Sequence, residues 1–169
     1  ILRFALRIDK NEEETQAKRG FGHLEAMTLN TFSVKITNKM IFGKTVKEVR
    51  HILDRDFMIS QIHRPDNNSN KEMVNGQTVL NEGDIIYVVA HPTVQEPLIA
   101  LCGEKIDMAW EEFGNELITR RIRITKPGIN GKTISQMQIR SNLGTNITRV
   151  NRAGVDLIAT PNLKLQLGD

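Results

Sequence analysis

The sequence has one cysteine, few aromatic residues and no long apolar run, and each of these shortages excludes a class of protein. With Cys102 alone, no intrachain disulfide can form, and its apolar neighbours indicate a small buried hydrophobe rather than a nucleophile. Aromatic residues make up 5% of the chain and the net charge is only +3, which argues against a nucleic-acid-binding surface. The longest apolar run, residues 85–90, is far shorter than the roughly 18–20 residues that cross a bilayer.

The sequence also lacks a catalytic or metal-binding cluster. Its histidines lie at positions 23, 51, 63 and 91, and no two of them have the spacing of a helical metal-binding pair. Gly-Lys-Thr occurs at 43–45 and at 131–133, but a phosphate loop needs a further glycine five positions earlier, where Asn38 and Lys126 stand. The sequence therefore predicts no catalytic residue, no metal site and no nucleotide hydrolysis.

What the sequence does contain is an internal repeat. Gly-Lys-Thr-Val at 43–46 returns as Gly-Lys-Thr-Ile at 131–134, a shift of 88 (131 − 43), and an apolar-apolar-Arg pattern at 59, 62 and 64 returns at the same shift. Leu-Asn-Glu-Gly-Asp at 80–84 returns as Leu-Gln-Leu-Gly-Asp at 165–169, a shift of 85 (169 − 84). The difference falls in the intervening loop, where a change of length costs little. A duplicated module without catalytic residues predicts a paired binding or regulatory unit.

Each copy contains a helix start signal directly after its Gly-Lys-Thr turn. Thr45 with Glu48, and Thr133 with Gln136, have the spacing of a capping box, in which each side chain bonds the other residue's backbone N–H. One side of the first predicted helix is apolar and is expected to be buried. The residues on that side are Val46, Val49, Ile52 and Leu53.

Alternating and apolar segments around these helices predict strands. In the first copy the strands are expected at 31–36, 57–62, 72–74 and 85–90, with a last helix from Pro92 to Gly103. In the second copy they are expected at 117–125, 144–152 and 155–159. The second copy reaches Gly168 and Asp169, which match the turn before the strand at 85–90. It is therefore expected to be C-terminally incomplete and to leave an unpaired sheet edge.

These patterns predict an α+β protein of two similar small modules, each a mainly antiparallel sheet with a capped helix after its first strand. The predicted divisions are a juxtamembrane segment and linker at 1–29, a first module at 30–103, a connecting helix at 104–116 and a second module at 117–169. Residues 1–10 are apolar with spaced arginines and precede a charged stretch, a pattern typical of the cytoplasmic flank of a membrane span. An ordinary first helix or strand is the alternative interpretation.

A candidate binding site lies where the second long strand of each copy ends. An arginine at both of these strand ends is suited to bind an anion bidentately. Solvation, or pairing with a nearby acidic residue, is the alternative role for these arginines. The candidate ligand-binding residues are Ile62, His63, Arg64, Pro65, Asn151 and Arg152.

The order of these elements resembles the TrkA-C domain, the C-terminal module of regulators of potassium conductance. The similarity is strongest over residues 79–90, with Ala90 where the family usually has glycine. The second copy is similar through Gly168 and Asp169. Two adjacent copies, preceded by an apolar, Arg-containing stretch and a Glu-rich linker, resemble the central cytoplasmic region of aspartate–alanine exchanger family transporters.

The resemblance implies a non-enzymatic, regulatory, ligand-sensing region on the cytoplasmic face of the bacterial inner membrane. Its implied partners are the membrane-embedded halves of the same polypeptide, a second copy in a homodimer and a small-molecule effector, with no nucleic acid. No cofactor is assigned. The implied effector is a small anionic or nucleotide ligand, because some relatives in potassium channels bind a cyclic dinucleotide near the strand end that matches residues 62–65. The alternative function is a regulatory subunit of a potassium uptake or channel system, which a dinucleotide-binding domain upstream would favour.

Overall fold

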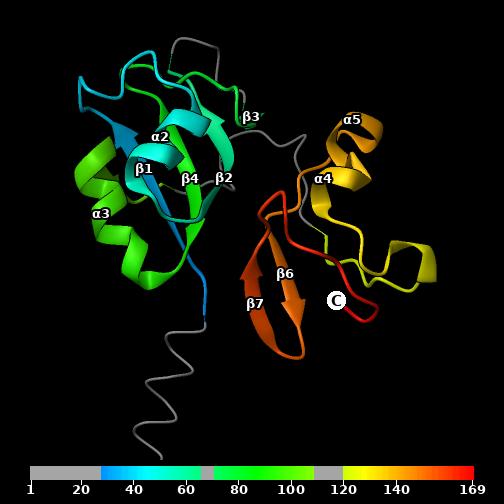
Figure 1. Cartoon of the computed structure of the whole chain (residues 1–169). Helices are drawn as coiled ribbons and strands as arrows, with labels where there is room; N and C mark the ends of the chain where they lie inside the picture. Colours follow the sequence, from blue (N-terminus) through cyan, green and yellow to red (C-terminus); the bar gives the residue numbers. More distant parts are fainter. Residues whose placement is uncertain (1–27, 66–70, 109–119) are drawn as a thin grey trace, which may run out of the picture.

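The computed structural model describes residues 28–65, 71–108 and 120–169. Residues 1–27 of the predicted juxtamembrane segment and linker lie outside the described residues, as do residues 109–116 of the predicted connecting helix with Trp110 and Phe113. The described chain consists of a first part, residues 28–108, and a smaller second part, residues 120–169 (Figure 1). No helix in the described residues has both the length and the apolar character needed to span a membrane.

The first part is a five-stranded antiparallel sheet with strand order β3-β2-β4-β1-β5. The strands are β1 (Asn30–Ile36), β2 (Phe57–His63), β3 (Lys71–Met73), β4 (Ile85–Ala90) and β5 (Gly103–Ile106). The apolar strand predicted at 85–90 is confirmed as β4, the central strand. On its two sides, Ile86 pairs with Val34 of β1 and with Ile62 of β2.

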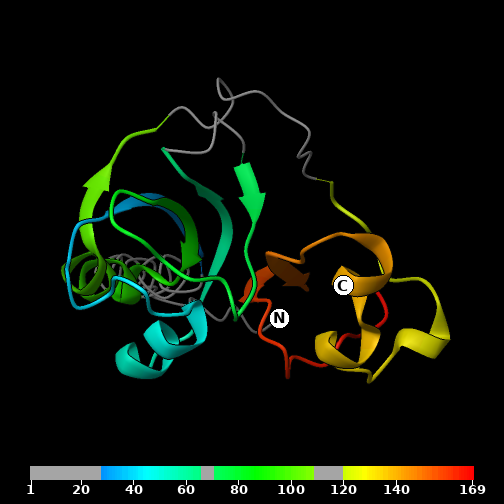
Figure 2. The same ribbon diagram turned by 90° about the horizontal axis from the view of Figure 1, so that it is seen from above.

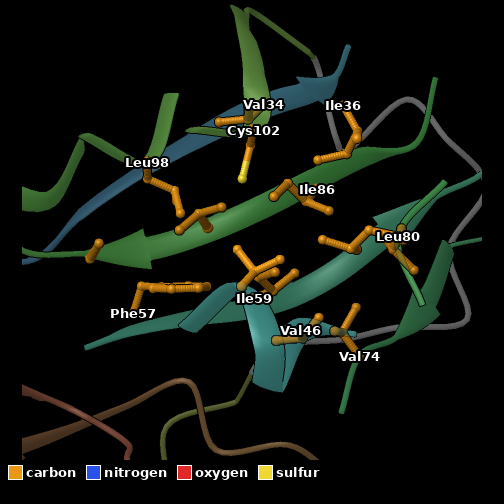
Figure 3. Close-up of a cluster of buried hydrophobic side chains, with 14 of the residues drawn as sticks. Val34, Ile36, Val46, Phe57, Ile59, Val74, Leu80, Ile86, Leu98 and Cys102 are labelled. Atoms are coloured by element: carbon orange, nitrogen blue, oxygen red, sulfur yellow. The ribbon is translucent and has the colours of Figure 1, made fainter. Parts of the chain in front are cut away.

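Two helices, α2 (Val46–Leu53) and α3 (Pro92–Cys102), share one hydrophobic core with this sheet. Figure 3 shows side chains of α3, including Leu98 and Cys102, close to Ile86 in the centre of the sheet. Cys102 is fully buried, and this burial raises the pKa of its thiol to about 12. The prediction that Cys102 is a small buried hydrophobe is confirmed, and its protonated thiol is a poor nucleophile.

Both predicted capping boxes are formed. At the start of α2, Thr45 Oγ1 accepts from the Glu48 N–H at 3.3 Å, and Glu48 Oε2 accepts from the Thr45 N–H at 2.7 Å. At the start of the shorter helix α4 (Ile134–Met137), Thr133 and Gln136 make the same two bonds. The predicted burial of Ile52 is wrong, because its side chain lies on the outer side of α2 and is 50% exposed.

Removal of either capping threonine is expected to weaken the structure around its helix. Thr45→Ala should lower the free energy of unfolding by about 1 kcal/mol, because one helix N–H loses its acceptor. Thr133→Ala should have an effect of the same size, measured by urea denaturation of each variant against the unchanged chain. A much larger effect in either copy would show that the threonine does more than cap the helix.

The predicted connecting helix at 104–116 is wrong at its beginning, because residues 103–106 form β5 on the edge of the sheet. Gly103 ends α3 with φ 148°, a conformation that side-chain-bearing residues rarely adopt, and this allows the chain to turn directly from helix into strand. Its Cα also approaches the backbone of Lys35 and Thr37 in a way that leaves no space for a side chain. Local sequence patterns cannot reveal such an approach.

The second part contains a β-hairpin and short helices. Its elements are η1 (Pro127–Ile129), α4, α5 (Ile139–Leu143), β6 (Arg149–Arg152) and β7 (Val155–Ile158). The strand predicted at 117–125 is wrong for its described residues, since 120–125 form no strand. In the first part the matching strand β1 pairs with β4, and no described strand takes the place of β4 in the second part.

The two parts touch through the face of the sheet opposite α2 and α3. Val89 of β4 and Met58 of β2 pack with Leu29 and with Ile158 of β7. The Asn146 side chain donates to the Val74 carbonyl at 3.1 Å. Figure 2 shows the second part beside the first sheet in the view from above.

Candidate functional site

In the first part, Arg64 lies directly after β2 and contacts three groups. Its Nη1 is 3.3 Å from Glu72 Oε2, and its Nε is 3.9 Å from Asp84 Oδ1. Its Nη2 donates to the Val79 carbonyl at a long 3.4 Å. The Asp84 side chain is 3% exposed, so the arginine compensates the charge of a buried carboxylate, although loosely.

In the second part, Arg152 at the end of β6 makes a tighter version of the same arrangement. Its Nε and Nη2 donate to the two carboxylate oxygens of Asp169 at 2.8 and 2.7 Å, a bidentate pair. Nη2 also donates to the Lys164 carbonyl at 2.7 Å. The hydrogen bond from Arg152 holds the pKa of the Asp169 carboxyl below its ordinary value, and the pKa of Arg152 is raised in return.

We call each of these pairs, Arg64 with Asp84 and Arg152 with Asp169, an Arg–Asp clamp. Each aspartate also accepts from a backbone N–H three residues before it, at 2.8 Å in both copies. This local bond closes the Gly-Asp turn in both copies. The clamp itself was missed, although the sequence carried a signal for it: an arginine and a later aspartate recur together in both copies.

The backbone around the two clamps is also bonded alike. Glycine N–H groups at 43 and 131 donate to the leucine carbonyls at 80 and 165, each at 2.8 Å. Glycine N–H groups at 83 and 168 donate to the isoleucine carbonyls at 36 and 124, each at 2.9 Å. Residues of the second part up to Arg152 thus match residues 88 positions earlier, and those from 159 onward match residues 85 positions earlier. We call two residues related by these shifts matching residues.

The remaining predicted binding residues have different surroundings. Ile62 is fully buried in the core, and His63 is 9% exposed. Pro65 is exposed, and Asn151 donates to Asp156 Oδ1 at 2.7 Å. The structure thus groups residues 62–65 at the end of β2 and residues 151–152 at the end of β6, and their role in ligand binding stays a prediction.

The two arginines differ in how firmly they are held. Arg152 is already bonded to a carboxylate and a carbonyl, so an external anion would have to displace Asp169. Arg64 makes longer contacts, and its buried Nε has no hydrogen-bond partner among the described residues. Arg64 is therefore better placed than Arg152 to exchange a present contact for an anionic ligand.

A pocket of about 340 Å³ opens in the second part beside Met58 of the first sheet. It is lined by Met58, Ile134, Ser135, Gln138, Ile139, Thr145, Asn146, Ile147, Ala159 and Pro161. None of these described lining residues carries a charged side chain. The lining residue Thr145 matches Phe57 of the first part. Phe57 is larger and is buried in the core beneath Arg50. This pocket was not predicted, because it depends on how Met58 and the second part meet. No group of metal-binding side chains occurs among residues 28–65, 71–108 and 120–169.

Comparison with known proteins places the first part in a family. Residues 32–103 match the TrkA-C domain. The chain therefore contains a TrkA-C domain over the region where the sequence predicted its first module, and this match ends at Gly103, where β5 begins.

Relatives over the whole chain are larger proteins. The chain is 44% identical over 168 residues to a protein of Bacteroides fragilis (strain YCH46) called an uncharacterized transporter, covering 99% of this chain and 30% of that protein. A protein of Bacteroides thetaiotaomicron with the same description is 36% identical over 166 residues, covering 98% and 29%. The chain thus spans about 30% of the length of the relatives it matches. Among solved structures, "GsuK channel bound to NAD" is similar with a TM-score of 0.36 and 16% identity, covering 54% of this chain and 16% of that one.

Proposed function

We propose that this chain is the cytoplasmic regulatory region of a bacterial inner-membrane transporter of the aspartate–alanine exchanger type. The observation that carries the proposal is the TrkA-C domain at 32–103 within a chain that is related over almost its full length to proteins described as transporters. Because those relatives are about three times as long as this chain, the transport step is assigned to the rest of the polypeptide. The regulatory region itself is non-enzymatic in this proposal.

We further propose that residues 117–169 belong to a second TrkA-C-like module. The repeated capping boxes, glycine turns and Arg–Asp clamps support this proposal, because unrelated segments have no reason to share so many contacts at fixed shifts. The paired modules would also provide surfaces for a homodimer.

Regulation in this proposal is a shift between two arrangements of the modules. A small ligand that binds one arrangement more tightly favours that arrangement, and the membrane-embedded halves follow it. The ligand can change the equilibrium only by its difference in affinity between the two arrangements. We propose a small anionic or nucleotide ligand that contacts Arg64 with its neighbours in 62–65, with Asn151 and Arg152 as the corresponding residues of the second copy.

A thermal-shift panel tests ligand binding. The probes are L-aspartate, L-alanine, ATP, cyclic di-AMP and potassium chloride, added separately to the chain. A ligand present at about 100 times its Kd stabilises the folded state by about 2.7 kcal/mol, which raises the Tm by roughly 5–10 °C for a chain of this size.

The arginine variants locate the site. Arg64→Ala is expected to abolish most of that Tm increase. Because the variant also loses the loose contact with buried Asp84, its Tm increase is measured against its own Tm without ligand. Arg55→Ala, which removes an exposed arginine outside the clamp, is the control and should leave the increase unchanged. An equal response of all three proteins to the same probe would remove Arg64 from the site.

A further inference from the structure

Several apolar residues are buried in the first part, whereas the apolar residues that match them in the second part are more exposed to solvent. Val34 of β1 is fully buried, whereas Ile122 at the matching position is 74% exposed. Five further pairs are buried in the first part and half-buried in the second: Ile36 and Ile124, Ile41 and Ile129, Val46 and Ile134, Val49 and Met137, Ile59 and Ile147. The pocket beside Met58 is lined by two of these residues, Ile134 and Ile147.

In the first part, β4 and α3 cover these apolar residues, and no described element covers the matching residues of the second part. Ile86 and Val88 of β4 and Leu98 of α3 belong to the same core as Val34 and its buried neighbours (Figure 3). The hairpin β7-β6 of the second part matches β3-β2, and residues 120–124 match β1. We call residues 120–124 and β6 the two walls, because they match β1 and β2, between which β4 lies in the first part. Among the described residues, no strand lies between the two walls, and this place of the central strand is empty.

The backbone hydrogen bonds of Ile124 with Gly168 and Asp169 are those that directly precede β4 in the first part. The Ile124 N–H donates to the Asp169 carbonyl oxygen and the Ile124 carbonyl accepts from the Gly168 N–H, both at 2.9 Å. Matching bonds join Ile36 to Gly83 and Asp84, directly before β4 begins. Because alternate residues of an extended chain direct their backbone groups to the same side, the N–H and carbonyl of Ile122 face the empty place.

Asp169 joins the two walls. Its backbone bonds residue 124 of one wall, and its carboxylate is held by Arg152 at the end of β6, the other wall. The Arg–Asp clamp therefore fixes the point at which a strand would enter between them.

We propose that residues 120–124 and β6 form a slot for one antiparallel strand, and that its occupant is the polypeptide that continues from Asp169. The register of the first part assigns the partners: the first residue after Asp169 pairs with Arg123 and Asn151, and the second, which is apolar and points into the core, pairs with Ile122 and Val150. The relatives are long enough to supply this strand and a covering helix. This inference rests on the proposed second module but not on the proposed regulatory role.

The test appends a copy of residues 85–106, which are β4, α3 and β5 of the first part, to Asp169 of the full chain. Backbone amide exchange is then compared between the extended protein and the 169-residue chain. The Ile122 amide is expected to exchange at least about 100-fold more slowly in the extended protein, because it gains a strand partner. The amide of Ile86 in the first part reports whether that part remains folded and should be unchanged.

A matched control carries Ile86→Asp and Val88→Asp in the appended copy only, and it should leave Ile122 exchanging as in the 169-residue chain. Unchanged exchange of Ile122 in the unmodified extension, with the first part intact, would overturn the slot. A dimer of the 169-residue chain in which Ile122 is already protected would overturn the assigned occupant, because a second copy would then fill the slot. Neither readout depends on ligand or transport, so the slot and the regulatory role can fail separately.

Discussion

Replacing Gly103 by alanine is expected to lower the free energy of unfolding of the first part by about 3–5 kcal/mol. A Cβ at this position would lie against the Lys35 carbonyl oxygen and 2.6 Å from the Thr37 backbone nitrogen. Both are backbone atoms of or next to β1, which is paired on both sides and cannot move aside cheaply. The φ of 148° adds backbone strain for any residue other than glycine.

Gly76→Ala is the matched control for Gly103→Ala. A Cβ at Gly76 would make only an ordinary contact, 3.8 Å from Lys47 Cβ, and its φ lies outside the left-handed region. This variant should therefore change the free energy of unfolding by less than about 1 kcal/mol, in either direction. Urea denaturation followed through the methyl signals of Leu98 measures both variants. Equal losses in the two would contradict the close approach at Gly103.

Replacing Asp169 by asparagine is expected to destabilise the second part by about 2–3 kcal/mol at pH 7. The Asp169 side chain is 3% exposed and accepts both bonds of the guanidinium, so the variant leaves Arg152 without its counter-charge. Asp156→Asn is the control, since Asp156 pairs with Arg149 at 3.3 Å near the surface, and it should cost about 1 kcal/mol or less. Urea titration of the Leu165 methyl signals reports on this part.

The contribution of the Asp169 clamp should also depend on pH in a definite direction. Because Arg152 lowers the pKa of Asp169 in the folded state, the clamp stabilises fully above the unfolded carboxyl pKa of about 3.9. The contribution is lost as the pH falls below that value and through the lower folded pKa. The difference between the unchanged chain and Asp169→Asn should therefore be constant from pH 5 to 7 and shrink below about pH 4. A difference that persists unchanged at pH 2 would show that charge is not its cause.

Local signals allowed much of the first part to be predicted. Thr45 with Glu48 located the start of α2, and Pro92 and Gly103 located both ends of α3, because each of these residues acts on its neighbours in sequence. The position of β5 was not predicted, because it depends on Gly103 approaching a distant strand. Ile52 was misplaced because periodicity alone does not define how wide a buried helix face is.

The candidate site was predicted only in outline. The sequence identified Arg64 and Arg152 as strand-end residues, but the partner of each arginine lies 17 to 20 positions later in the chain and is reached only after a turn of the fold. Residues 120–125 carry strand-like alternation and form no strand, since a strand also needs a neighbour to pair with. The two clamps show what the repeat preserves, and their unequal distances show that Arg152 is held more tightly by its aspartate than Arg64 is.

We propose that the folded TrkA-C domain regulates transport, and exchange by the complete transporter is the measurement that can support or exclude this role. Labelled L-aspartate uptake is measured in proteoliposomes loaded with L-alanine, with equal amounts of inserted protein carrying Gly103→Ala or Gly76→Ala. We expect Gly76→Ala to transport like the unchanged protein, whereas Gly103→Ala, measured at a temperature at which its weakened domain has unfolded, should change the uptake rate by at least about fivefold. The same uptake rate in both variants, with the domain unfolded in Gly103→Ala, would contradict it.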